Sequence, residues 1–146
     1  MTSRIVVVDA SVGIKLVLQE TDSARAELLF QVMIDEPDSL FYVPSLFFAE
    51  CANILWKCVN RGEMTAATAC AEERYLRDIP FCVYPLHSLS EGALQLALKH
   101  NISAYDGCYC ALARQLKAPL VIADEKLARK LADADFSAVL LREWVA

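Results

Sequence analysis

Residues 5–9 read Ile-Val-Val-Val-Asp, and this stretch decides the fold class. A short, continuous run of β-branched residues favours a strand that is buried on both faces, as strands of parallel sheets are. Asp9 comes directly after this run, at its carboxyl end. Because ligands of open α/β folds collect at the carboxyl edge of the sheet, the stretch predicts a parallel sheet with an acid at its ligand-binding edge.

The same pattern recurs near the other end of the chain, where Leu120-Val121-Ile122-Ala123 is followed by Asp124. Three further strands are expected, at residues 40–43, 81–84 and, more weakly, 139–141. Helix-like stretches separate them, at residues 9–18, 21–35, 44–61, 65–78, 88–100, 103–116 and 124–133. Strands that alternate with single or paired helices predict a mostly parallel sheet covered on both faces, with right-handed crossovers.

Capping residues set several of these helix boundaries. Thr65 is expected to begin one helix, and Gly62 to end the helix before it. Ser88 with Glu91, and Ser103 with Asp106, have the spacing of capping boxes. These pairs predict helices that begin near residues 88 and 103.

The length of 146 residues fits a single domain covering residues 1–146. With 56% hydrophobic residues and a mean hydropathy of +0.33, the chain has more apolar side chains than a typical small domain. A well-packed monomer is one interpretation. We favour a dimer or a bound partner, because large exposed apolar patches mark interfaces.

No stretch approaches the roughly 20 apolar residues that a membrane-spanning helix needs. The first residues, Met-Thr-Ser-Arg, lead directly into the first strand, which is unlike a secretory signal peptide. We therefore expect a cytoplasmic protein. The six cysteines include no C-x-x-C pair, so reduced thiols are favoured over a zinc site or disulfides.

The formal net charge of -5 and a pI of about 5.0 argue against a broad nucleic-acid-binding face. They do not exclude a nuclease, because bound divalent cations reverse the local field. Lys15, Lys57 and Arg114 are candidates for phosphate contact, although solvated surface is the favoured interpretation of each.

Four acids are the candidate functional residues, and each also has a purely structural interpretation. Asp9 and Asp124 could each be a helix N-cap. Asp106 could be only the third-position acid of its capping box, favoured there by the helix dipole. Glu50 could belong to a solvated helix face, or it could be an active-site acid that Asn53, three residues further on, helps to orient.

The combination of acids favours a site for one or two Mg²⁺ or Mn²⁺ ions. Several converging carboxylates would repel one another unless a cation joined them, and hard cations prefer oxygen ligands. Two such ions about 4 Å apart could activate a water molecule and stabilise the leaving oxygen in phosphodiester cleavage. No cysteine or histidine is needed for this chemistry.

Four segments carry a resemblance to a known family, and they span nearly the whole chain in that family's order. They are residues 7–11 (VVDAS), 44–55 (PSLFFAECANIL), 104–106 (AYD) and 123–127 (ADEKL). With these segments the chain resembles PIN-domain proteins of the VapC type, the toxins of bacterial toxin–antitoxin pairs. The resemblance implies a three-layer α/β/α sandwich and a ribonuclease that depends on Mg²⁺ or Mn²⁺.

The resemblance also assigns roles to the matching positions. Asp9, Glu50, Asp106 and Asp124 match the family's metal-binding acids, and Ser11 and Asn53 match its supporting polar positions. It further implies a small antitoxin protein that blocks the site, an RNA substrate and a homodimer. Relatives often carry Thr or Ser two residues before the last acid, whereas this chain has Ile122.

Other classes fit the sequence less well. A phosphatase of the haloacid dehalogenase class would need a second Asp two residues after Asp9, where this chain has Ser11. A receiver-type phosphoacceptor would need paired acids near the first strand and a Lys at the end of a late strand. The alternative that stays open is a catalytically silent PIN-like module that binds protein or RNA.

Overall fold

The central sheet has five strands in the order β3-β2-β1-β4-β5, and each neighbouring pair is parallel. The structure, a computed structural model, describes residues 3–144. Its strands are β1 (Ile5–Val8), β2 (Leu40–Pro44), β3 (Cys82–Tyr84), β4 (Leu120–Ile122) and β5 (Ala138–Leu140). The predicted strands are thus confirmed, with boundaries that differ by a residue at most.

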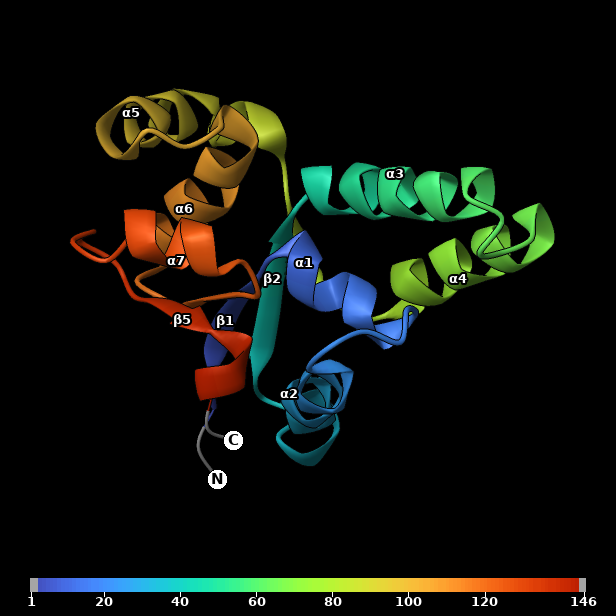
Figure 1. Cartoon of the computed structure of the whole chain (residues 1–146). Helices are drawn as coiled ribbons and strands as arrows, with labels where there is room; N and C mark the ends of the chain where they lie inside the picture. The colour runs from blue at the N-terminus through green and yellow to red at the C-terminus, as the bar shows by residue number, and fades with distance from the viewer. Residues whose placement is uncertain (1–2, 145–146) are drawn as a thin grey trace.

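Helices cover both faces of this sheet. The α-helices are α1 (Ala10–Gly13), α2 (Ser23–Asp35), α3 (Leu46–Asn60), α4 (Ala66–Asp78), α5 (Ser90–His100), α6 (Ala104–Leu116) and α7 (Glu125–Lys130). Short 3₁₀ helices are η1 (Ile14–Leu16), η2 (Leu86–Ser88) and η3 (Leu141–Glu143). Helices α1–α4 lie to the right of the sheet and α5–α7 to the left in Figure 1. The expected three-layer α/β/α sandwich is therefore confirmed.

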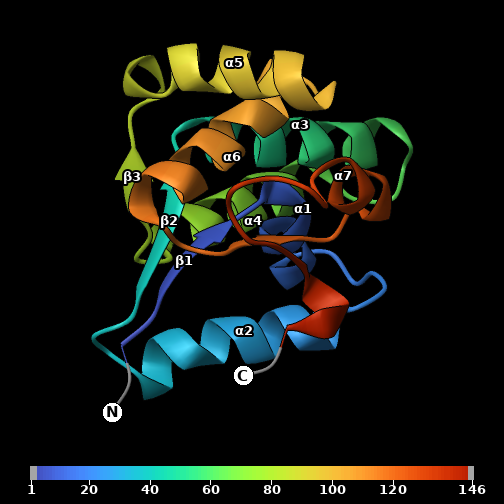
Figure 2. The same cartoon turned by 90° about the vertical axis from the view of Figure 1, so that its left-hand side faces the viewer.

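The order of the strands creates a switch point at the centre of the sheet. The chain passes from β1 outward to β2 and β3, then crosses back to β4 on the other side of β1. Helix α6, which makes that return, packs on β1, β2 and β4 and lies in front of the sheet in Figure 2. The carboxyl ends of β1 and β4 therefore flank the crevice in which doubly wound folds bind ligands.

The two central strands are apolar without alternation because both of their faces are covered. Residues 6–8 of β1 and 120–122 of β4 are at most 1% exposed. On the α1–α4 side, the rings of Phe30, Phe41, Phe47 and Phe81 form a connected aromatic cluster. This core holds the first strand between two helical layers and so fixes the position of the acid at its end.

Local capping explains most helix boundaries. The side chain of Thr65 accepts a hydrogen bond from the Thr68 amide, and Gly62 after α3 has a left-handed φ of 74°. The predicted capping box of Ser88 is wrong. Ser88 lies in η2 and its hydroxyl donates to the Pro85 carbonyl oxygen, so α5 begins at Ser90 without a side-chain cap.

Among residues 3–144, no helix is long and apolar enough to cross a membrane. All six cysteines are free thiols. Cys51, Cys58 and Cys110 are buried, whereas Cys70 is exposed. The expectation of reduced thiols is met, but only half of them are in the core.

Candidate active site

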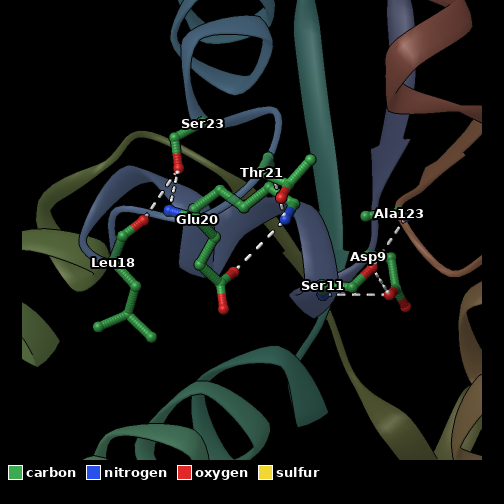
Figure 3. A network of polar contacts seen from close by, with 8 residues as sticks. Asp9, Ser11, Leu18, Glu20, Thr21, Ser23 and Ala123 are labelled. Carbon is green, nitrogen blue, oxygen red and sulfur yellow. Dashed lines mark hydrogen bonds and ion pairs between the residues drawn. The ribbon is translucent and has the colours of Figure 1, made fainter. Parts of the chain in front are cut away.

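Asp9 is a buried acid at the carboxyl end of β1, only 7% exposed. It caps α1, since its Oδ2 accepts hydrogen bonds from the Ser11 amide at 3.1 Å and the Ser11 hydroxyl at 2.5 Å. The Ser11 hydroxyl oxygen in turn accepts from the Ala123 amide at 3.1 Å (Figure 3). Ser11 therefore links the ends of β1 and β4 and fixes one oxygen of Asp9.

Glu50 lies in the second turn of α3 and is half-buried. Its Oε1 accepts a hydrogen bond of 2.7 Å from the hydroxyl of Tyr109, a buried residue of α6. Gly13 lets α3 approach the site closely, because a Cβ atom there would lie 2.4 Å from the ring of Phe47. Two helices from opposite faces of the sheet thus position the Glu50 carboxylate.

Asp106 and Asp124 both lie at helix starts. The Ser103 hydroxyl oxygen accepts from the Asp106 amide at 3.0 Å, which confirms the predicted capping of α6 by Ser103. Oδ1 of Asp124 accepts from the amides of Lys126 and Leu127 at 2.9 and 3.2 Å, so this acid caps α7. Asp124 is exposed, whereas Asp106 is half-buried.

Three of the four acids, Asp9, Glu50 and Asp106, have raised pKa values, and the charge of at least one other acid of the four contributes to each. Burial raises the pKa of Asp9 to about 7, with smaller contributions from the charges of Asp106 and Glu50 and an opposing one from Ser11. Burial also raises the pKa of Glu50, against the hydrogen bond from Tyr109 and together with the charge of Asp106. Elements that are distant in sequence therefore meet in one negatively charged region.

Asp106 is the acid that joins the group. Burial raises its pKa, the hydrogen bond with Ser103 opposes this, the charge of Asp124 raises it further, and the charge of Lys130 lowers it. Its charge also acts on both Asp9 and Glu50. Within residues 3–144, none of the four acids forms an ion pair with a basic side chain.

The donor set fits a hard divalent cation. The hydrogen bonds use one oxygen each of Asp9 (Oδ2), Glu50 (Oε1) and Asp124 (Oδ1), which leaves the second oxygen of each for another ligand. In the described part of the chain, no three His, Cys, Asp or Glu side chains are placed so that they could hold a metal ion together. An ion would draw the carboxylates together, and Mg²⁺ ordinarily keeps several of its waters.

Several supporting residues differ from expectation. Asn53 is exposed, and the hydrogen bond to Glu50 comes from Tyr109 instead. Tyr109 was missed because a buried tyrosine in an apolar helix resembles ordinary core. Ile122 is fully buried in β4, so it faces the core at the position where relatives often carry a hydroxyl.

The three candidate phosphate-contacting residues, Lys15, Lys57 and Arg114, do not all lie in one place. Lys15 donates to Glu20 and to the Thr21 carbonyl oxygen, and it lines a pocket beside Asp124 together with Lys57. Arg114 lines other hollows, between α5 and α6 and near β5. Only the first two therefore lie next to the acids.

Comparison with known proteins places this arrangement in a family. Residues 6–132 match the family model described as the PIN domain. The chain is similar to the protein named ribonuclease VapC3 of Pyrobaculum aerophilum, with 34% identity over 127 residues, which cover 85% of this chain and 92% of the relative.

Two solved structures share the fold at lower identity. PAE2754 from Pyrobaculum aerophilum has a TM-score of 0.70 and 22% identity, covering 95% of this chain and 85% of its own. A toxin–antitoxin complex from Klebsiella pneumoniae has a TM-score of 0.64 and 13% identity, covering 95% and 99% respectively. At these identities the likeness concerns the fold.

Proposed function

The chain belongs to the PIN-domain family, and on this basis we propose that it is a metal-dependent endoribonuclease, the toxin of a type II toxin–antitoxin pair. The name of its relative, a ribonuclease at 34% identity over most of both chains, supports this proposal. The cluster of four acids at the switch point of the sheet supports it independently. We further propose that the protein acts in the cytoplasm.

The proposed ligands of the cation, Mg²⁺ or Mn²⁺, are the carboxylates of Asp9, Glu50, Asp106 and Asp124. When bound, such an ion lowers the pKa of water and offsets charge on a phosphodiester. Asp9 would contribute from the end of β1, Asp106 from the first turn of α6 and Asp124 from the start of α7. The raised pKa values of Asp9, Glu50 and Asp106 support this assignment, because a cation would remove the repulsion that contributes to them.

The residues around the acids orient them. Ser11 holds Oδ2 of Asp9 and is itself held by the Ala123 amide, so its hydroxyl serves positioning and is not available as a nucleophile. Tyr109 holds one oxygen of Glu50. Asn53 follows Glu50 by one helical turn on the exposed face of α3, where it would support a bound substrate. No side chain then needs to form a covalent intermediate.

The proposed partners are a small antitoxin protein and a second copy of the chain. The fold that this chain shares with the Klebsiella toxin–antitoxin complex supports the first. Leu94 and Leu98 on α5 and Tyr105 on α6 are 54%, 76% and 66% exposed. This apolar surface supports a homodimer, because contiguous exposed apolar groups mark interfaces.

The observation that carries the proposal is a cluster of four acids at the carboxyl edge of the sheet that have no ion-pair partner among residues 3–144. Its test is an RNA cleavage assay with Mg²⁺ or Mn²⁺ and with EDTA, on the wild-type protein and Asp9→Asn. We expect cleavage that EDTA abolishes and that Asp9→Asn lacks while it stays folded. Asp38→Asn, an exposed acid in the turn before β2, is the matched control. RNA binding without metal-dependent cleavage would instead favour the catalytically silent module.

A further inference from the structure

A pocket of about 380 Å³ is lined in part by Asp124, one of the four acids. It shares Ser11 and Asp124 with the candidate active site, and its rim includes Lys15, Lys57 and Arg61. Its volume is within the range of roughly 300–1,000 Å³ that is usual for small-ligand sites. The pocket therefore has the size and the position to hold a group attached to whatever the acids act on.

Helix α3 connects the acids to this pocket. Glu50, Ile54, Lys57 and Arg61 follow one another at spacings of four, three and four residues. Side chains at such spacings share one face of a helix. One face of α3 therefore runs from an active-site acid to the basic rim of the pocket.

The basic side chains that line the pocket differ in the hydrogen bonds and ion pairs that they already form. The Nζ atom of Lys15 donates to the Thr21 carbonyl oxygen at 2.8 Å and to Oε1 of Glu20 at 3.4 Å. Lys57 and Arg61 are exposed, and neither forms an ion pair between residues 3 and 144. These two side chains are therefore free to meet an anion.

The position of these cations has two physical consequences. Lys57 in the last turn of α3 and Arg61 at its C-cap both complement the negative end of the helix dipole. Basic residues on any other exposed side of that turn would do the same. Only the face that they occupy also lines a hollow next to the acids. In a chain with a net charge of -5, a local pair of unengaged cations there favours an anionic ligand.

The lining of the pocket is mixed. Ile14, Ile54 and Ala123 are its apolar residues, and Glu20 and Asp124 add two acids to the three basic side chains. Such a lining fits a flat heterocyclic base against Ile54 and Ala123 and a phosphate at Lys57 and Arg61, because Glu20 already pairs with Lys15. Such a base must be unpaired, because the unstacked bases of single-stranded RNA can turn outward and enter a pocket.

We propose that this pocket binds the nucleotide adjacent to the scissile phosphate of single-stranded RNA, with that nucleotide's phosphate at Lys57 and Arg61. The proposal rests on the proposed ribonuclease function and adds a second binding site to it. It makes Lys57 and Arg61 substrate-positioning residues, while Lys15 holds the loop that carries Glu20 and Thr21.

The test measures binding of a fluorescein-labelled, mixed-sequence 12-nucleotide single-stranded RNA by anisotropy, in full-length Asp9→Asn with Mg²⁺ so that cleavage does not interfere. The double variant Lys57→Gln/Arg61→Gln removes the rim charges. Its matched control, Arg74→Gln/Lys99→Gln, removes two exposed charges on α4 and α5. Circular dichroism and thermal melting establish that each variant is folded.

We expect Lys57→Gln/Arg61→Gln to weaken binding about tenfold or more at 0.1 M salt. The slope of log K against log[salt] should fall in magnitude by about 0.7, because the variant loses its contact to one phosphate of a single strand. The control double variant should stay within about twofold of its parent. With Asp9 intact, the rim variant should raise KM for cleavage while kcat changes little.

Two results would overturn the proposal. If the rim variant and the control weaken binding equally, the effect is one of net charge and the pocket binds no nucleotide. If the rim variant binds like its parent while the wild-type protein cleaves RNA, the pocket proposal fails and the proposed ribonuclease function stands. A wild-type protein that neither binds nor cleaves RNA would reject both proposals together.

Discussion

Charged side chains are paired at the amino edge of the sheet, whereas the acids at its carboxyl edge form no ion pairs among residues 3–144. At the amino edge, Arg4 before β1 forms a two-pronged ion pair with Glu36, with both N–O distances at 3.1 Å. Ser39 before β2 completes it, accepting from the Arg4 amide and donating to Glu36. At the carboxyl edge, Asp9 and its three companion acids have no basic partner among residues 3–144.

This difference separates groups that hold the fold from groups that perform its chemistry. Paired charges with satisfied hydrogen bonds are compatible with stability. Clustered acids with raised pKa values lower stability at neutral pH, and such perturbed groups concentrate at functional sites. Changes at the carboxyl edge should therefore affect activity and metal binding, whereas changes at the amino edge should affect stability alone.

The largest effect is expected from Asp106→Asn, which removes the charge that acts on both Asp9 and Glu50. Metal-dependent RNA cleavage should fall by roughly a thousandfold, about 4 kcal/mol of transition-state stabilisation, without unfolding. Cleavage kinetics and circular dichroism measure the two properties. Asp38→Asn at the amino edge should cleave RNA normally, and a folded Asp106→Asn that does the same would remove the basis of the comparison.

A smaller effect, on stability, is expected from Asp9→Asn. The pKa of Asp9 is about 7 in the folded protein and close to 4 in an unfolded chain, so folding binds a proton between these values. The stability that this proton contributes is present below pH 4 and is lost as the pH rises through 7.

Asp9→Asn has no such proton to lose. In EDTA at pH 8, its free energy of unfolding should therefore exceed that of the wild-type protein by about 2–4 kcal/mol, and at pH 4 the difference should nearly vanish. Urea unfolding across this pH range measures it. A variant that is equally destabilised at every pH would show that Asp9 serves the fold.

Tyr109→Phe should make the Glu50 carboxylate less firmly positioned without removing its charge. The change deletes the hydroxyl that donates to Glu50. Removing such a supporting hydrogen bond typically weakens a metal site about tenfold, so the Kd for Mn²⁺ should rise by about that factor in calorimetry. Tyr84→Phe, which removes a hydroxyl that contacts Gln115, is the control and should leave the Kd unchanged.

The smallest effect is expected at the amino edge. Glu36→Gln breaks the ion pair with Arg4, whose side chain is 28% exposed and that of Glu36 21%. Because the pair is partly solvated, the free energy of unfolding should fall by only about 1 kcal/mol. RNA cleavage per folded molecule should not change. A loss of cleavage at full stability would contradict the separation of the two edges.

The layers of the fold were readable from the sequence because local signals agreed with it. Residues 5–8 and 120–122 are continuous apolar runs, as strands covered on both faces must be. Ser103 and Thr65 cap their helices as their spacing predicts. The prediction that Ser88 caps a helix failed because a 3₁₀ turn follows Pro85. The Ser88 hydroxyl donates to the Pro85 carbonyl oxygen instead.

Asp9, Asp106 and Asp124 were candidates because each follows a strand or begins a helix, and Glu50 because it lies early in a helix that follows a strand. The residue that holds Glu50 could not be predicted in this way. The partner of Glu50 is Tyr109, 59 residues away, and no local pattern links the two. Arg61 was missed for a similar reason, since only the packing of α1 against α3 places it on the rim of a pocket. Sequence periodicity identifies faces of elements, whereas contacts between elements require the structure.

We propose above that four carboxylates at one edge of the sheet hold a divalent cation. The most direct test of this proposal is a crystal structure of the full chain grown with millimolar Mn²⁺, with anomalous diffraction data. The account predicts an anomalous peak between the carboxylates of Asp9, Glu50, Asp106 and Asp124. A map without a peak there, or with Mn²⁺ bound only at other acids, would contradict it.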